Sequence, residues 1–150
     1  MTDRTRGQSK TLRRDYLETG SIPVIDQGAG AVAGYTDDEG SAYRGSLPVI
    51  LFGDHTRAFK YVDFRFALGA DGVKVLEAAP GLNSKFVYYY LRSRRIPARG
   101  YSRHFKHLNK LRVPRIPPSE QERIVETLER ADALLGLREE ASLRVNRVLP

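Results

Sequence analysis

The sequence predicts an α+β protein: a small domain of short β-strands with a few helices, followed by a long, protruding C-terminal α-helix of the coiled-coil type. Two observations carry this prediction. Up to residue 77, short runs of β-branched and aromatic residues are separated by turns that contain Gly and Asp, which is typical of strands. After Ser119, no proline occurs before Pro150 and apolar residues recur at spacings of three and four, which is typical of a helix. We therefore expect a flexible basic N-terminus at 1–14, a globular domain at 15–117 and the long helix at 118–150.

The composition narrows the class of protein. A chain of 150 residues suits one domain with its own core, and 41% hydrophobic content is ordinary for a globular protein. The absence of cysteine excludes disulfides and cysteine-ligated metal centres. No apolar run approaches the roughly 20 residues of a membrane span, and the N-terminus lacks the apolar centre of a secretory signal. The composition predicts a soluble, cytoplasmic protein with no membrane partner.

The strands are expected in the first half of the chain, after one helical turn at Asp15–Glu18. Pro23 places the first strand at a sheet edge or at a strand start, because proline has no backbone N–H to donate. The run at 47–52 is the clearest buried strand, and the composition of Gly69–Gly72 is typical of a hairpin turn. The expected strands are Ile22–Ile25, Val32–Tyr35, Leu47–Phe52, Tyr61–Phe66 and Val73–Leu76.

Two short helices and one long helix are expected in the second half. Apolar residues at spacings of three and four predict a helix from Ser84 to about Arg94. Ser102 can cap a second, short helix. Prolines then keep the chain extended as far as Ser119. Ser119 precedes Glu122 by three residues, which is the spacing of a capping box at the start of the long helix.

The long helix carries an apolar stripe that needs a partner. About 30 residues of helix span roughly 45 Å, which is more than so small a domain requires. Two interpretations are open: the stripe pairs with the same helix of a second copy as a two-stranded coiled coil, or the helix folds back on the sheets as a core helix. In the first interpretation the interface residues are Ile124, Leu128, Leu135, Leu137, Val145 and Val148.

The positive charge of the chain is concentrated in Ala78–Ser119. This segment contains ten Lys or Arg and no Asp or Glu, whereas the flanks at 1–77 and 120–150 are slightly acidic. Tyrosine, phenylalanine and histidine are interleaved with the basic residues. A local positive field that contains aromatic side chains is typical of a nucleic-acid surface. A solvated basic face and an RNA-binding module that stacks bases are the alternatives.

The sequence lacks the motifs of common enzymes. It contains neither a P-loop nor a glycine-rich dinucleotide fingerprint. Asp54 and Asp63 have no further acid at a spacing suited to magnesium. His104 and His107 with His55 could ligate a metal, but a hydrogen bond within the fold or a phosphate contact suits His104 better. We expect a protein that binds and does not catalyse, with no metal and no cofactor of its own.

Six segments, in this order, resemble the specificity subunit of type I restriction–modification enzymes. They correspond to a single target-recognition domain followed by the start of its spacer helix, and the resemblance runs from about Thr11 to the end. Each segment alone is weak evidence, but six in the right order, with a proline-rich entry into a long helix, make a specific match. The segments are IPVIDQG (Ile22–Gly28), LPVILFGDHTR (Leu47–Arg57), FALGADGVKVL (Phe66–Leu76), FVYYYL (Phe86–Leu91), GYSRHFKHL (Gly100–Leu108) and IPPSEQERIVETL (Ile116–Leu128).

The resemblance implies sequence-specific recognition of double-stranded DNA. It also implies assembly with a modification (methyltransferase) subunit and a restriction (motor and endonuclease) subunit, which would carry S-adenosylmethionine, ATP and magnesium. Members of the family have two recognition domains in tandem whose helices pair antiparallel, whereas this sequence has one domain and one helix. It is therefore interpreted either as a half-subunit that forms a homodimer through the helix, or as a truncated fragment that acts only through its helix.

The expected DNA-binding residues come mainly from the basic segment. An arginine near the N-terminus of the short helix could reach the O6 and N7 atoms of guanine, and that terminus suits a phosphate. Base reading is expected either from Gly100–Lys106 or from the loops at Gln27–Gly40. The expected residues are Arg57, Lys85, Arg95, Arg99, Tyr101, Arg103, His104, Lys106 and Lys110.

Overall fold

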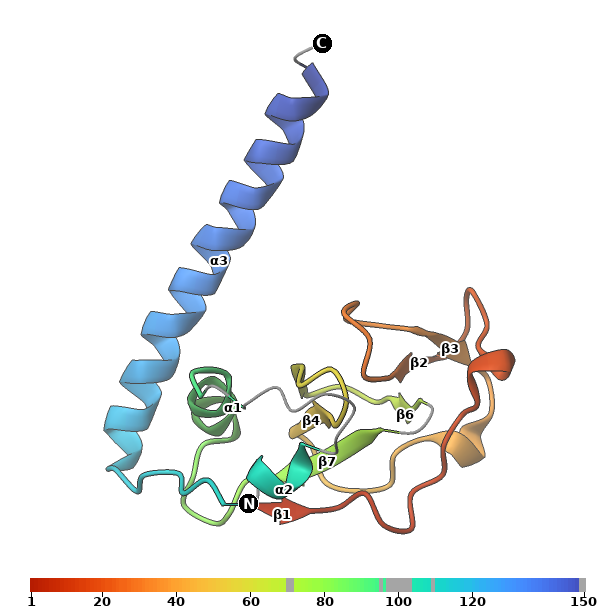
Figure 1. Cartoon of the computed structure of the whole chain (residues 1–150), viewed down its shortest axis with the longest axis horizontal. Helices are drawn as coiled ribbons and strands as arrows, with labels where there is room; N and C mark the ends of the chain where they lie inside the picture. The colour runs from red at the N-terminus through yellow and green to blue at the C-terminus, as the bar shows by residue number, and fades with distance from the viewer. Residues whose placement is uncertain (70–71, 95, 97–103, 109, 149–150) are drawn as a thin grey trace.

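The computed structural model describes residues 1–69, 72–94, 96, 104–108 and 110–148, the last four of these by their backbone alone. Two small sheets and two short α-helices form a domain, and one long helix projects from it (Figure 1). The predicted α+β class with a long C-terminal helix is confirmed. None of the described helices is both long and apolar enough to cross a membrane.

The first sheet contains four antiparallel strands in the order β1-β7-β4-β5. Strand β4 lies inside this sheet, and all five of its residues are buried, as its continuous apolar run predicts. Its Leu51 lies opposite Val75 on one side and Lys60 on the other. The strands are β1 (Thr2–Asp3), β4 (Val49–Gly53), β5 (Phe59–Val62) and β7 (Val73–Glu77).

The second sheet has the order β3-β2-β6, with β2 (Ile22–Ile25) in the centre between β3 (Gly34–Thr36) and β6 (Ala67–Leu68). The sequence places β2 at an edge or at a strand start because of Pro23. The prediction of an edge strand is therefore wrong. Proline is tolerated near the start of β2 because pairing with β6 begins only at Val24, so the missing N–H of Pro23 lies outside that ladder.

Two layers of the core lie on the two faces of β4, and a third, smaller cluster of Ile22, Val24 and Ala67 belongs to the second sheet. Because side chains alternate along a strand, Val49 and Leu51 point to the second sheet and Ile50 and Phe52 point to the helices. The first cluster contains Ile25, Val49, Leu51, Val62, Phe66, Leu68, Val73 and Val75. The second contains Ile50, Phe52, Leu76, Val87, Leu91 and Leu108. The helices of the basic segment therefore pack directly on the first sheet.

Several expected elements have different boundaries. Strand β5 ends at Val62, and Phe64 has 44% of its surface exposed, so the predicted strand at 61–66 ends after its first two residues and β6 begins only at Ala67. The predicted hairpin at Gly69–Gly72 is wrong, because β6 pairs with β2 whereas β7 pairs with β4 and β1; residues 70 and 71 lie outside the described residues. The helical turn covers Arg13–Asp15. For the strands, the boundaries depend on which other strand each one pairs with.

The N-terminal residues, expected to be flexible, are part of the sheets. Thr2 and Asp3 pair with the outer edge of β7, and the backbone N–H of Arg4 donates to Val75 O at 2.8 Å. Thr11 is buried, and its N–H donates to Leu68 O at 2.8 Å. The polar composition of this segment does not predict these hydrogen bonds, because they are formed by the backbone N–H and C=O groups and not by the side chains.

The predicted helices are present. Helix α1 (Ser84–Arg92) is capped by Asn83, whose side chain accepts from the N–H groups of Lys85 and Phe86. Helix α2 (Phe105–Leu108) is a single turn. Helix α3 (Pro118–Val148) begins one residue before the predicted cap at Ser119, because proline suits the first helical position, where an N–H would have no partner in the helix.

Helix α3 leaves the domain after its first turns. It contacts α1 near its start, where Gln121 and Val125 are buried. Beyond Asp132 every described side chain is exposed as far as Arg144, and the helix stands away from both sheets (Figure 1). The interpretation of α3 as a core helix folded back on the sheets is therefore wrong.

Candidate nucleic-acid interface

Among the described basic residues of Ala78–Ser119, Lys85 and Arg92 are paired with acids of α3. Lys85 forms an ion pair with Glu129, and Arg92 Nη1 lies 2.9 Å from Asp132 Oδ2. The hydrogen bond to Glu129 raises the pKa of Lys85. Lys85, an expected DNA contact, therefore lies at the junction of α1 and α3. Counting charges along the chain hides this compensation, because the acids lie outside the segment.

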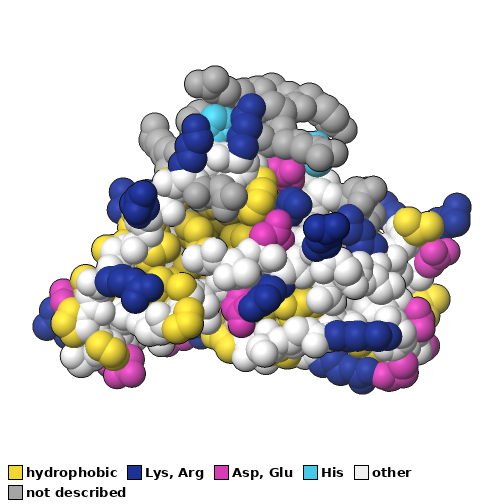
Figure 2. All heavy atoms as spheres, turned by 90° about the horizontal axis from the view of Figure 1, so that it is seen from below, with side chains coloured by type: hydrophobic (Ala, Val, Ile, Leu, Met, Phe, Trp, Pro, Cys, Tyr) yellow, Lys and Arg dark blue, Asp and Glu magenta, His cyan; other side chains and the backbone are white. Residues whose placement is uncertain are grey.

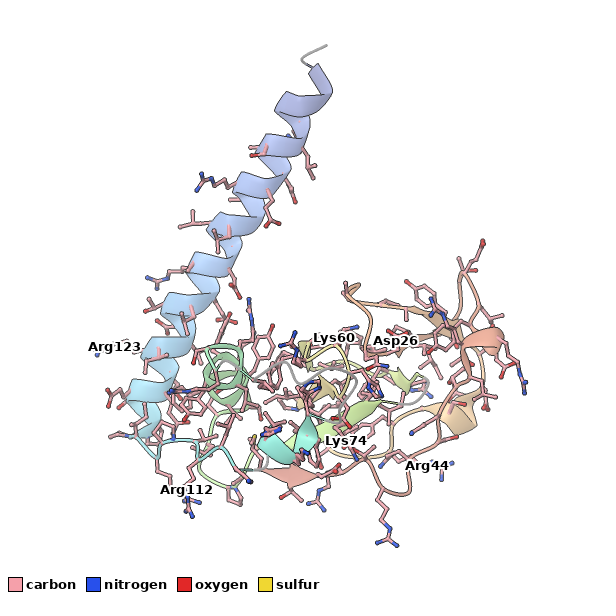
Figure 3. All side chains as sticks on the ribbon, in the orientation of Figure 1. Asp26, Arg44, Lys60, Lys74, Arg112 and Arg123 are labelled. Atoms are coloured by element: carbon pink, nitrogen blue, oxygen red, sulfur yellow. The ribbon has the colours of Figure 1, made fainter. Side chains whose placement is uncertain are left out.

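Arg94 and Arg112 both contact Tyr90. The guanidinium of Arg94 stacks over the ring of Tyr90 at 4.4 Å, and the hydroxyl of Tyr90 donates to Arg112 O at 2.8 Å. Tyr90 thus fixes the extended segment before α3 against α1. Figure 3 shows Arg112 pointing away from the domain on its lower side.

The remaining described cations of the segment are exposed on α2 and on the extended chain that follows it. The described part of the chain contains no ion-pair partner for them. Seen from below, Lys and Arg side chains lie around exposed hydrophobic ones, with Asp and Glu side chains between them (Figure 2). We define the basic surface as Arg94, Lys106, Lys110, Arg112 and Arg115. Arg95, Arg99, Tyr101 and Arg103, expected at the same surface, lie outside the described residues.

Helix α2 is held in place by the turn after β4. Asp54 is buried, and its Oδ1 accepts from the N–H of Phe105 at 2.7 Å. Its carbonyl oxygen lies 2.8 Å from Nδ1 of His104 and accepts from the His104 N–H at 3.3 Å. Its own N–H donates to Gly72 O at 2.6 Å. Asp54 therefore connects the first sheet to the element that carries Lys106.

This arrangement changes two expectations. His104 is only 2% exposed. The expected hydrogen bond within the fold is therefore present, and the side chain of His104 is not exposed for the expected contact with DNA. The N–H of Phe105, which a phosphate at the start of α2 would require, already donates to the Asp54 carboxylate. A negative group of the protein thus occupies the position that the sequence assigns to a ligand.

Lys74 contacts α2, and Arg57 contacts the chain after α1. Arg57 ends the turn between β4 and β5 with a left-handed backbone (φ 62°), and its Nη1 donates to Ile96 O at 3.1 Å. Lys74 of β7 lies 5.0 Å above the ring of Phe105 and 3.5 Å from Asp3. Arg57 is an expected site residue. Lys74 was missed, because a lysine within a strand gives no sign of which helix will lie beside it.

Lys60 closes the Gly-rich loop after β2. Its Nζ donates to Asp26 O at 2.7 Å and to Gly30 O at 2.6 Å, and burial lowers its pKa. Figure 3 shows Lys60 and Asp26 close together on the side of the domain away from Arg112. The two groups of residues expected to read bases therefore differ in position: the loop lies beside Lys60, whereas Lys106 lies on α2.

Comparison with known proteins gives one clear similarity. No family model matches the chain, and no solved structure does. Over 81 residues, 52% of the chain, it is 37% identical to the Type I restriction enzyme EcoR124I/EcoR124II specificity subunit of Escherichia coli. The aligned part covers 20% of that protein. Over about half its length, this chain is thus similar to part of a type I restriction enzyme specificity subunit, as the six segments predict.

Proposed function

We propose that this chain is the DNA-recognition component, as a subunit or half-subunit, of a type I restriction–modification system. It binds duplex DNA at a defined sequence and directs methyltransferase and endonuclease subunits to that site. The similarity to a specificity subunit, at 37% identity over 81 residues, carries the proposal. The chain itself has no catalytic role, and S-adenosylmethionine, ATP and magnesium belong to the partner subunits.

The basic surface supports the DNA-binding part of this proposal. Its five cations are exposed and follow one another along the end of α1, α2 and the chain leading to α3. Lysine and arginine held in this way can neutralise successive phosphates and release their counterions. Phosphate contacts of this kind position a protein on DNA without reading its sequence. Sequence reading then falls to groups beside these five cations.

The binding experiment uses a pool of random-sequence DNA duplexes. The chain is incubated with the pool, and the bound fraction is sequenced after separation. We expect one enriched sequence, and we expect single-stranded RNA of the same length to compete poorly for the enriched duplex. If nothing is enriched and RNA competes as well as DNA, the chain is an RNA-binding module. If neither nucleic acid binds, it is a fragment that acts only through its helix.

We also propose that α3 pairs with α3 of a second copy. Leu134, Leu135 and Leu137 are 67%, 57% and 63% exposed, and a row of exposed leucines on one helix is unusual for a monomer. Charge favours an antiparallel arrangement. Residues 118–132 carry five acids, of which Glu129 and Asp132 pair with Lys85 and Arg92 of α1, and two arginines, whereas residues 133–148 carry three arginines and two acids. Two antiparallel helices place the acidic half of each beside the basic half of the other.

The mass in solution tests this pairing. We expect light scattering to give the mass of two chains, each of 16.9 kDa. The double variant Leu134→Glu, Leu137→Glu should reduce that mass to one chain, because four carboxylates would then face each other at the interface. Glu139→Gln with Glu140→Gln is the control on the same turns and should keep the mass of two chains. A single-chain mass for the parent at tens of micromolar would exclude the pairing.

A further inference from the structure

The junction between the domain and α3 is organised around a buried polar residue. Gln121, in the first turn of α3, is 1% exposed. Its Oε1 accepts from the N–H of Asn83 at 2.7 Å, and its Nε2 donates to Gly81 O at 3.1 Å and to Ile116 O at 2.9 Å. Both amide hydrogens and the carbonyl oxygen therefore have partners, as a buried amide requires.

The partners of Gln121 come from the two segments that meet at the start of α3. Gly81 and Asn83 lie just before α1, and Asn83 also caps α1 through its side chain. Ile116 lies at the end of the extended chain that leads into α3. The side chain of Gln121 thus connects the beginning of α3 both to the beginning of α1 and to the extended chain that precedes α3.

A second polar contact lies roughly three turns further along α3. Asp132 Oδ2 accepts from Arg92 Nη1 at 2.9 Å and from the hydroxyl of Tyr89 at 3.1 Å. Burial, together with the hydrogen bond to Asp132, raises the pKa of Tyr89 to about 12, so this hydroxyl keeps its proton at neutral pH. The ion pair of Lys85 with Glu129 lies between the two contacts.

Apolar packing at this junction is limited. Val125 is the buried apolar side chain of α3 in the described part of the chain, at 8% exposure, and Leu128 is already 37% exposed. Apolar contact has no preferred direction, whereas a hydrogen bond weakens when its angle changes. Hydrogen bonds at two separated points along α3 therefore define the direction of the helix axis relative to the domain.

We propose that Gln121 is the positioning residue that fixes the direction in which α3 leaves the domain, with Asp132 as the outer contact. Helix α3 then has one fixed orientation relative to the domain and does not rotate freely about its connection to it. The consequence for DNA rests on the proposed function: in an assembly of two copies, the separation of the two domains follows from this direction.

Spin labels can measure this direction, because the chain has no cysteine of its own. Ser46→Cys in the domain and Ser142→Cys on α3 are both exposed positions. Labelled chain mixed with excess unlabelled chain gives the distance within one copy by electron–electron double resonance. We expect one narrow distribution for the parent. Gln121→Met, which keeps the length and removes all three hydrogen bonds, should broaden or shift it, and Asp132→Ala, which removes the acceptor of the outer contact, should do so to a smaller extent.

Val125→Ala is the control, since it weakens packing at the same junction and leaves the polar contacts in place. It should lower the melting temperature and leave the distribution narrow. If Gln121→Met lowers the melting temperature but leaves the distribution as in the parent, Gln121 has only a packing role and the proposal is overturned. Should Gln121→Met not fold, an unchanged distribution in Asp132→Ala overturns the two-point arrangement. No DNA is involved, so the result is independent of the proposed function.

Discussion

Replacing Lys106, Lys110, Arg112 and Arg115 together by glutamine is expected to weaken binding to duplex DNA by about a thousandfold at 0.15 M salt. Each phosphate that a cation neutralises contributes about 0.9 to the slope of log affinity against log salt, so four contacts contribute up to about 3.6. The loss should be similar for every DNA sequence, because phosphate contacts carry no sequence information. Fluorescence anisotropy at several salt concentrations measures both quantities.

The matched control removes the same charge from the N-terminal part of the domain. Arg6, Arg13, Arg14 and Arg44 are exposed and belong neither to the basic surface nor to α3, and their replacement by glutamine should leave the salt slope close to that of the parent. If both quadruple variants lose the same affinity, binding responds to net charge and not to the basic surface. A slope unchanged in the first variant would show that these four residues do not meet phosphates.

The second large effect is expected at Asp54. In Asp54→Ala the N–H of Phe105 loses its acceptor in a buried position, which costs about 1–3 kcal/mol. Helix α2 should then detach from the turn after β4 more readily than the sheets unfold. We expect urea denaturation to show the lower free energy of unfolding, and hydrogen exchange to show faster exchange at residues 105–108 than in the strands.

Asp54→Asn provides the control, since an amide oxygen in the same place can still accept the bond. Its loss of stability should be smaller than that of Asp54→Ala, and its DNA affinity should stay nearer to that of the parent, because α2 still presents Lys106. Equal losses in the two variants would show that the carboxylate acts through its charge and not as the acceptor for α2.

The elements could be predicted from the sequence where local chemistry decides them. β4 is an uninterrupted apolar run, α1 has an apolar stripe after Asn83, and α3 has no proline between Pro118 and its end. The six segments likewise predicted the similarity to a specificity subunit. Such features depend on residues that are adjacent in the sequence, so they can be predicted without knowledge of the tertiary structure.

The candidate site could be predicted only in part. The basic character of Ala78–Ser119 follows from composition alone, and it correctly includes Lys106 and Lys110 among the exposed cations. Pairing of Lys85 with Glu129 could not be read in the same way, because the acid belongs to a different element. His104 is polar and lies between basic residues, yet it is buried against Asp54, and nothing near it in the chain indicates this.

The sequence by itself determined the buried strand β4, helix α1, the segment where positive charge gathers and the long apolar-striped helix in the C-terminal part of the chain. Only the tertiary structure decided which cations remain unpaired among the described residues, that the start of α2 is occupied by Asp54, and that Gln121 joins α3 to α1. The physical reason is the range of the interactions. Helix and strand preferences arise within a few residues, whereas an ion pair or a buried hydrogen bond forms between groups that only folding brings within about 3 Å of each other.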